Sequence, residues 1–385
     1  MYTGELNHNR PTRYRRGLKE NTVHVIVNHN PSEASPADEL VVKMPQLTKD
    51  SVLYPNSLKL TYKYKLDTNA TEADIPDHLS SAIIQKSKFT INGQTIWDTD
   101  NYNHLKVYKE MHKPKHEYDK ELTHLGIQKA ETKRKRHNIS GAAEDTLASI
   151  HGERYAYNLE CFFTDTSFTP QAIHNSIEFH LKLAPGKYTL KNICLEYDYV
   201  IEPSLAREIV QKYTNYTHFI DDYKCHTVKN LKDEESNFEI NINASYESLR
   251  AILTLFKADN TVSTMYPYPM ITDKKVDVDG SANQLYPTGY LPQYSYQDAK
   301  NYFQTDPQSE SHVNQESFYG DKYSLVTDFR TINDEKSSGI GRQIKDYVKL
   351  KLSKGETEDV GKAFVYPVTE KAVSFLNNQL SGVEQ

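Results

Sequence analysis

Short stretches in which apolar and polar residues alternate recur in both halves of the chain. They lie at 58–66 and 177–183 in the first half, and at 238–243 and 348–352 in the second. Successive side chains of a β-strand point to opposite faces, so strict alternation indicates an antiparallel sheet with one face on a core. The pattern therefore predicts an all-β chain with a few short helices, built as two sandwiches or barrels.

The length of 385 residues allows two domains that each bury a core of their own. We predict a first sandwich over residues 22–203, a linker helix over 204–220 and a second sandwich over 221–385. Pro203 ends the strand before this joint because it lacks an N–H group, and Ser204 is a candidate cap for the helix. A polar arm at 1–21 precedes the first strand, which begins near Val23.

Alternation disappears in two long segments. Residues 100–152 predict a charged insertion that starts with a helix carrying Tyr102, Leu105, Tyr108 and Met111. Residues 262–320 are rich in Tyr, Pro, Ser and Gln and predict long loops, which in compact domains usually form functional surfaces. Between strands of the first sandwich, Asn92-Gly93 predicts a tight hairpin, because both residues tolerate positive φ.

Composition narrows the class of protein. The net charge of −6 and the isoelectric point near 6.2 exclude a globally basic nucleic-acid binder. Three widely spaced cysteines argue for a reducing compartment, and no apolar run approaches the roughly 18 residues of a membrane span. We therefore expect a soluble protein made in the cytosol. The 28 tyrosines exceed what cores require and predict protein–protein contact surfaces, although tyrosine is also a good strand former.

The sequence offers no catalytic residues, metal site or cofactor site. It lacks a phosphate-binding loop, a nucleophile elbow and a zinc-binding helix motif. His112 and His116 have the i, i+4 spacing of helical metal ligands, but Pro114 lies between them and no acidic ligand completes a site. We therefore predict that the protein is not an enzyme.

Two groups of residues are candidates for contact with partners. The first is the basic arm, which would either neutralise phosphates or an acidic neighbour, or merely keep the terminus soluble. The second is a set of tyrosines in the second half, which would either form a subunit interface or pack within their loops. The arm group is Arg10, Arg13, Arg15, Arg16 and Lys19, and the tyrosine group is Tyr286, Tyr290, Tyr294, Tyr296 and Tyr302.

The order of several segments resembles the double-jelly-roll major capsid proteins, in particular those of Polinton (Maverick) elements and adintovirus-like DNA viruses. The resemblance covers most of 85–260 and about the last 40 residues, and it is weak at 262–340 and over the first 60. No single motif is diagnostic. The segments that carry it are Phe89 to Trp97, Glu160 to Phe163, Ile177 to Leu183, Ile201 to Ala206, Leu249 to Leu255 and Ala363 to Phe375.

This resemblance implies two eight-stranded jelly rolls in one chain. It further implies a homotrimer of pseudo-hexagonal outline, and trimers that tile an icosahedral capsid around a DNA genome. The implied partners are the chain itself, penton or minor capsid proteins, and packaged DNA through the arm. The implied location is the virion capsid, after synthesis in the host cytoplasm and assembly there or in the nucleus.

Three other functions remain open on the sequence. A minor or penton-type capsid protein would contain a single jelly roll, which the duplicated strand set disfavours. A carbohydrate-binding jelly roll would need loop-borne calcium ligands, and Asp273 to Asp279 offers acids without suitable spacing. An enzyme on a sandwich scaffold would need a cleft of ionisable groups with perturbed pKa values.

Overall fold

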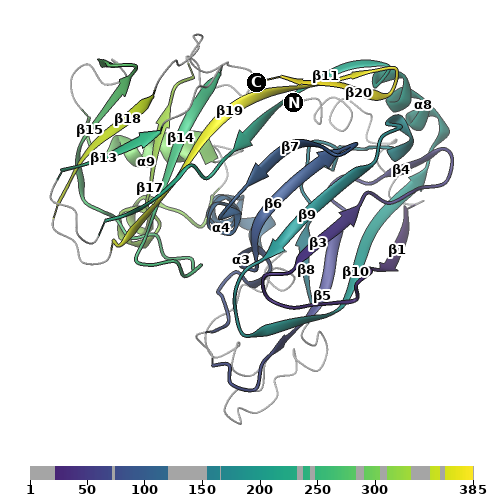
Figure 1. The fold of residues 1–385 in the computed structure, drawn as a ribbon, viewed down its shortest axis with the longest axis horizontal. Coiled ribbons are helices and arrows are strands. Elements are labelled where there is room, and N and C mark those ends of the chain that lie inside the picture. The colour runs from purple at the N-terminus through teal and green to yellow at the C-terminus, as the bar shows by residue number, and fades with distance from the viewer. Residues whose placement is uncertain are drawn as a thin grey trace. The chain divides into compact units, whose positions relative to one another are not determined.

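The computed structural model describes residues 22–71, 74–119, 154–164, 166–231, 237–242, 248–282, 290–303, 310–330, 347–355 and 360–384. The chain forms two compact units (Figure 1). Unit 1 comprises Met1–Asp98, Leu122–Ile220 and Ala372–Glu384, and unit 2 comprises Thr99–Glu121 and Asp221–Lys371. Each unit therefore contains at least one segment that is distant in sequence from the rest of it.

Strands dominate both halves of the chain, and their bounds match the alternation at several places. The stretch at 177–183 forms β9, in which buried and partly exposed residues alternate along its length. The strands of the first half are β1 (Thr22–Asn28), β2 (Glu33–Ala34), β3 (Glu39–Lys43), β4 (Ser51–Leu53), β5 (Lys59–Leu66), β6 (Ile84–Ile91), β7 (Gln94–Thr99), β8 (Arg154–Asn158), β9 (Ile177–Leu183) and β10 (Tyr188–Ile201).

The second half supplies the remaining strands. They are β11 (Asn215–Tyr223), β12 (Thr227–Asn230), β13 (Asn237–Ile242), β14 (Leu249–Lys257), β15 (Ile271–Val278), β16 (Ser281–Ala282), β17 (Ser324–Asp328), β18 (Val348–Lys354), β19 (Lys362–Leu376) and β20 (Gln379–Glu384). The helices are α3 (Leu79–Ala82), α4 (Tyr102–Met111), the 3₁₀ helix η3 (Pro170–Ala172), α8 (Pro203–Lys212), α9 (Tyr294–Phe303) and α10 (Gln315–Asp321).

Both halves use the same strand order. In the first half one sheet has the order β1-β10-β5-β8 and the other β3-β9-β6-β7; in the second half the orders are β11-β19-β14-β17 and β13-β18-β15-β16. In each half the first sheet thus joins the first, last, third and sixth of eight main strands, and the second sheet joins the other four. The first sheet of each half also contains two shorter or peripheral strands, β2 and β4 on β10 and β12 and β20 on β19. Two antiparallel sheets with four main strands each form a jelly roll, so the fold is a double jelly roll, as predicted.

The core of unit 1 is rich in aromatic residues and includes the C-terminal strands. Phe163 stacks on Phe168 with ring centroids 4.4 Å apart, and Tyr213 meets Phe375 edge-on at 5.3 Å. Val373 and Phe375 of β19 are buried in this core, although they lie about 150 residues or more beyond the rest of the unit. The end of the chain therefore stabilises the first jelly roll.

Helix α4 belongs to unit 2, although it directly follows the strands of the first half. Leu105, Tyr108 and Met111 share the buried core of unit 2, where Tyr108 meets Tyr266 and Phe303 edge-on. The sequence predicted this helix from its apolar spacing, and its bounds, Tyr102–Met111, confirm it. Its place in the second jelly roll depends on contacts distant in sequence.

The structure tests two predictions about local structure, a hairpin turn and a helix cap. Asn92 and Gly93 have φ values of 52° and 76° between β6 and β7, which confirms the tight hairpin. The proposed cap of the joint helix was wrong: α8 begins at Pro203, Glu202 is the N-cap, and the Ser204 hydroxyl instead donates to the Glu202 carboxylate at 2.6 Å. Proline favours the first helical position, because its missing N–H would have no partner there.

The range 262–320 contains regular structure where the sequence predicted loops. It forms β15, β16, α9 and α10 among its described residues. In α9, Ser295, Ala299 and Phe303 are buried at helical i, i+4 spacing, and in α10 Asn314 and Ser317 form a capping box. The tyrosine and proline content concealed this helical period. Most of the charged insertion, including Lys133 to Arg136, lies outside the described residues.

Candidate assembly surfaces

The structure describes four of the ten predicted contact residues. The five basic residues of the arm and Tyr286 lie outside the described residues. The four described tyrosines, Tyr290, Tyr294, Tyr296 and Tyr302, lie on α9 or directly before it in unit 2. Their exposure differs, which separates core positions from surface positions within the set.

Tyr290 and Tyr302 serve the interior of unit 2. Tyr290 is 5% exposed, and its hydroxyl is hydrogen-bonded to Ser295, which is in turn hydrogen-bonded to the Tyr323 hydroxyl at 3.0 Å. Tyr302 packs edge-on against Phe303, and the guanidinium of Arg330 lies over its ring at 5.0 Å. These two rings therefore have limited area available for a partner.

Tyr294 and Tyr296 lie nearer the surface. Tyr294 is 43% exposed and begins α9, whereas Tyr296 is half-buried against Phe318 of α10. An exposed tyrosine gives a partner a large contact area at low cost in side-chain entropy. Tyr294 is thus the described member of the set with the most area to offer.

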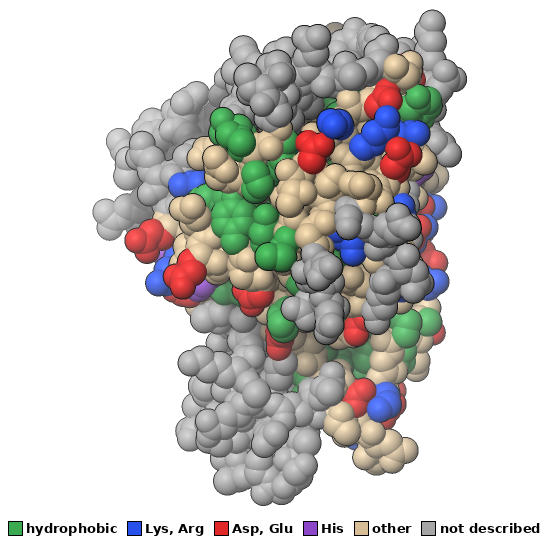
Figure 2. Space-filling view, turned by 90° about the vertical axis from the view of Figure 1, so that its left-hand side faces the viewer, with side chains coloured by type: hydrophobic (Ala, Val, Ile, Leu, Met, Phe, Trp, Pro, Cys, Tyr) green, Lys and Arg blue, Asp and Glu red, His purple; other side chains and the backbone are tan. Residues whose placement is uncertain are grey.

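Two segments of unit 2 carry exposed apolar residues, and we call this set the Met265 surface. It comprises Met265, Met270, Leu291 and Tyr294, which are 59%, 50%, 42% and 43% exposed, and the partly buried Tyr268. Tyr319 joins its two segments: its ring meets Tyr268 edge-on, and its hydroxyl donates to the carbonyl of Pro292 at 2.8 Å. Figure 2 shows unit 2 from the side of β13, β15 and β18, where hydrophobic side chains gather between acidic and basic ones.

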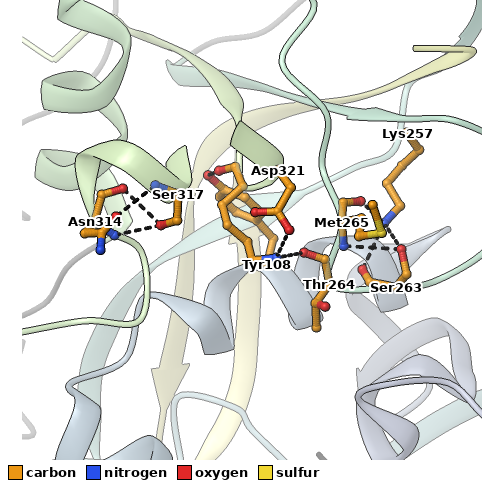
Figure 3. A network of polar contacts seen from close by, with 9 residues as sticks. Tyr108, Lys257, Ser263, Thr264, Met265, Asn314, Ser317 and Asp321 are labelled. Carbon is orange, nitrogen blue, oxygen red and sulfur yellow. Dashed lines mark hydrogen bonds and ion pairs between the residues drawn. The ribbon is translucent and has the colours of Figure 1, made fainter. Parts of the chain in front are cut away.

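Two lysines fix the segment that carries Met265. The buried ammonium of Lys257 donates to the carbonyls of Ser263 and Met265 at 2.9 and 2.6 Å, and that of Lys322 donates to the carbonyl of Thr264 at 2.6 Å. Asp321 pairs with Lys322, and Tyr108 donates to the Lys322 carbonyl (Figure 3). Because charged donors form strong hydrogen bonds in buried sites, these bonds hold the segment that carries Met265 in place.

Burial shifts the pKa of several groups in unit 2. It lowers the pKa of His104 and of His112 to about 3, because their rings stack on Phe364 and Phe303, away from water. Burial also lowers the pKa of Lys274 to about 8, and its ammonium donates to the carbonyl of Val326 at 3.0 Å. Each of these groups contacts an aromatic ring or a main-chain carbonyl.

The described residues include no group of three or more His, Cys, Asp or Glu that could hold a metal ion. His112 and His116 do not share a helix, because α4 ends at Met111; His116 is exposed and lies 4.0 Å from Glu117. All three cysteines are free thiols, and burial raises the pKa of Cys225 to about 11, which disfavours its reactive thiolate. No helix among the described ranges is long and apolar enough to cross a membrane.

The apolar side chains of β1 are more exposed than the sequence pattern indicated. The pattern predicted a strand at this position, which the structure confirms, and gave no sign of its exposure. Three of its apolar residues are largely exposed: Val23 at 41%, Ile26 at 56% and Val27 at 47%. The missing information is the position of β1 at the end of its sheet, which depends on long-range pairing. The lack of Lys, Arg, Asp and Glu within 22–28 was the available signal.

Comparison with known proteins identifies the fold. VP54 of the virus PBCV-1, fitted into the virophage Sputnik, matches with a TM-score of 0.61 at 9% identity, over 94% of this chain and 96% of that one. The Faustovirus major capsid protein matches with a TM-score of 0.56 at 8% identity, over 92% and 90%, and a chain of the Sputnik virophage structure with 0.56 at 9%, over 94% and 87%. No family model and no curated protein matches the sequence.

Proposed function

We propose that this chain is the major capsid protein of a DNA virus or related element. Three copies would form a trimer of pseudo-hexagonal outline, and such trimers would tile an icosahedral shell around DNA. The observation that carries this proposal is the repeated strand order, which makes the chain a double jelly roll almost end to end. The similar capsid chain of Faustovirus is covered over 90% of its length, and this chain over 92%.

The exposed apolar groups of unit 2 support assembly. Methionine and tyrosine side chains are typical of the buried centre of an interface. The Met265 surface contains these types, and Lys257 and Lys322 keep the segment of Met265 in place. We propose that this surface, which includes Tyr294, contributes to the contact between subunits of the trimer; Tyr286, outside the described residues, is proposed for the same contact from the sequence alone.

No observation favours the other functions. A penton-type protein with one jelly roll does not account for two. The acids considered for a calcium-dependent lectin are engaged: Asp273 and Asp277 pair with Lys275 and Lys351, and Asp279 accepts a hydrogen bond from the Tyr347 amide. Polinton or adintovirus origin, minor capsid partners and contact of the arm with DNA remain proposals based on sequence resemblance.

The test is the mass of the purified protein in solution. A trimer would weigh about 133 kDa (3 × 44.3 kDa), and a monomer or dimer at high protein concentration would contradict the proposal. Tyr294→Asp combined with Met265→Asp should dissociate the trimer, because two charges would be buried without partners. Asn241→Asp, on the exposed face of β13, is the control and should leave the trimer intact.

The arm is tested separately. Deletion of residues 1–20 should preserve the trimer but impair shell formation or its dependence on salt, because screened contacts of the basic residues would be lost. Loss of the trimer itself in the deletion variant would contradict the proposal that the arm acts in shell formation and not in the trimer.

A further inference from the structure

Among the described residues, no strand pairs with the outer side of β1, so this strand presents an open edge there. It is the terminal strand of its sheet and pairs with β10 on one side, from Thr22 opposite Val200 to Asn28 opposite Cys194. The His29 amide donates to Ile193 at 2.8 Å in the same register, so positions 23, 25 and 27 also bond to β10. The main-chain groups of His24, Ile26 and Asn28 therefore point away from the sheet.

The composition of this edge differs from that of an edge protected against pairing. Natural edge strands usually carry charges, proline or bulges that prevent contact with another strand. Strand β1 has the sequence TVHVIVN, with no Lys, Arg, Asp, Glu, Pro or Gly, and it pairs with β10 without a register shift. Three of its apolar side chains are more than 40% exposed.

Strand β3, the terminal strand of the other sheet of unit 1, shows the protected alternative. It begins at Glu39 and ends at Lys43, which contact His180 and Glu178 of the neighbouring strand. The outward carbonyl of Val41 accepts a hydrogen bond from the His29 ring at 3.0 Å. The two edges belong to one jelly roll, so the open edge of β1 is a local property and not a general feature of the fold.

We propose that β1 pairs with β1 of a second copy of this chain, antiparallel and about a twofold axis through Ile26. In this register Ile26 faces Ile26 of the partner copy, and His24 faces Asn28 of the partner copy. All outward main-chain groups of residues 24, 26 and 28 are then satisfied in both copies at once. Val25 and Val27 lie opposite each other across the axis, and no like charges oppose one another.

A second copy fits this edge better than an unrelated segment because the edge is self-complementary. Val25 packs on the core of unit 1, so Val23 and Val27, on the same face, form the uncovered margin of that core. A partner strand with valines at alternate positions would extend the apolar face, and β1 is itself such a strand. The pairing joins the sheets of two copies into one continuous sheet.

This contact is separate from the proposed trimer. A twofold contact is isologous and joins two copies, whereas a trimer requires a head-to-tail contact that closes after three copies. If both exist, β1 pairing links one trimer to the next. If the proposed trimer does not form, β1 pairing alone gives a dimer of about 89 kDa (2 × 44.3 kDa), so the two proposals fail independently.

The first experiment places a charge on the axis. Ile26→Lys brings two ammonium groups together at the twofold and should weaken association through β1 by about tenfold or more. Val41→Lys, on the exposed face of β3, is the matched control and should have no effect. Mass measurement against protein concentration reports the result, and equal association of Ile26→Lys, Val41→Lys and the wild type would overturn the proposal.

The second experiment identifies the partner strand. Hydrogen-bonded antiparallel pairs have Cα atoms about 5.5 Å apart, within the range that a disulfide spans. Ile26→Cys should therefore form a disulfide-linked dimer on mild oxidation, and Val41→Cys and the wild type should not. Absence of that dimer under conditions where the chain associates, a cross-link to another cysteine, or a chain that stays a single copy at all concentrations would each rule out β1-to-β1 pairing.

Discussion

Tyr266 donates its hydroxyl hydrogen to the main-chain carbonyl of His104 at 2.8 Å, across 162 positions of sequence. Both groups are buried in unit 2, and the Tyr266 ring also meets Tyr108 one turn further along α4. The bond ties a helix that follows the first set of strands to the connection between β14 and β15. The second jelly roll is thus completed by a segment from the first half of the chain.

Removal of this hydroxyl should destabilise unit 2. In Tyr266→Phe the ring contacts remain, but the His104 carbonyl loses a partner in a dry site, at a cost of about 1–3 kcal/mol in the free energy of unfolding. Chemical denaturation monitored by circular dichroism measures the change. Tyr294→Phe, at an exposed ring, is the control and should change the free energy of unfolding by less than about 0.5 kcal/mol.

The hairpin between β6 and β7 gives a second prediction. Gly93 has a φ of 76° with no neighbouring atom within 4 Å of an added Cβ, so Gly93→Ala adds backbone strain without a clash. We expect a loss of about 1 kcal/mol in the free energy of unfolding. Gly320 in α10 has equal space but no positive φ, so Gly320→Ala should be neutral or slightly stabilising. Similar losses for both variants would argue against strain as the cause.

Alternation and turn residues predicted several strands and the hairpin correctly. Features that depend on long-range packing could not be predicted in this way. The alternation at 177–183 and 238–242 became β9 and β13 with the expected buried faces. All nine residues of β14 are buried, so this strand has no exposed face and no alternation of buried and exposed positions. The assignment of α4 to unit 2 and the open edge of β1 both depend on which strands pair, and a single sequence does not encode that locally.

The candidate surfaces were predicted less completely than the fold. A high tyrosine content indicated contacts, but burial divides the set: Tyr290 lies in the core and Tyr294 at the surface. Composition alone does not distinguish these two roles. The period of α9 places Tyr294 outside the buried face marked by Ser295, Ala299 and Phe303, but Tyr290 precedes the helix and its burial depends on contacts distant in sequence.

Lys257 gives a third prediction, because its charge holds the segment before Met265. In Lys257→Met the side chain keeps a similar length, but the carbonyls of Ser263 and Met265 lose a charged donor. We expect a loss of about 3 kcal/mol in the free energy of unfolding and faster amide exchange over residues 258–266. Lys275→Met, at an exposed position on β15, is the control. Unchanged exchange in this segment would show that other contacts hold it.

The two buried histidines of α4 predict a loss of stability in acid. Their pKa values fall from 6.5 to about 3 on folding, so the unfolded chain binds protons more readily. The stabilisation is complete above pH 6.5 and is lost as the pH falls from 6.5 towards 3, at about 1.4 kcal/mol per pH unit for each ring. At pH 5 this amounts to about 2 kcal/mol per histidine.

His112 isolates this effect, because neither of its ring nitrogens has a hydrogen-bond partner among the described residues and its ring lies against Tyr108 and Phe303. His112→Leu removes the titrating group while it keeps an apolar side chain against those rings. The difference in the free energy of unfolding between this variant and the wild type should shift by about 2 kcal/mol in favour of the variant from pH 7 to pH 5. His116→Gln, at an exposed ring, is the control substitution, and a pH-independent difference for His112→Leu would mean that His112 does not titrate on unfolding.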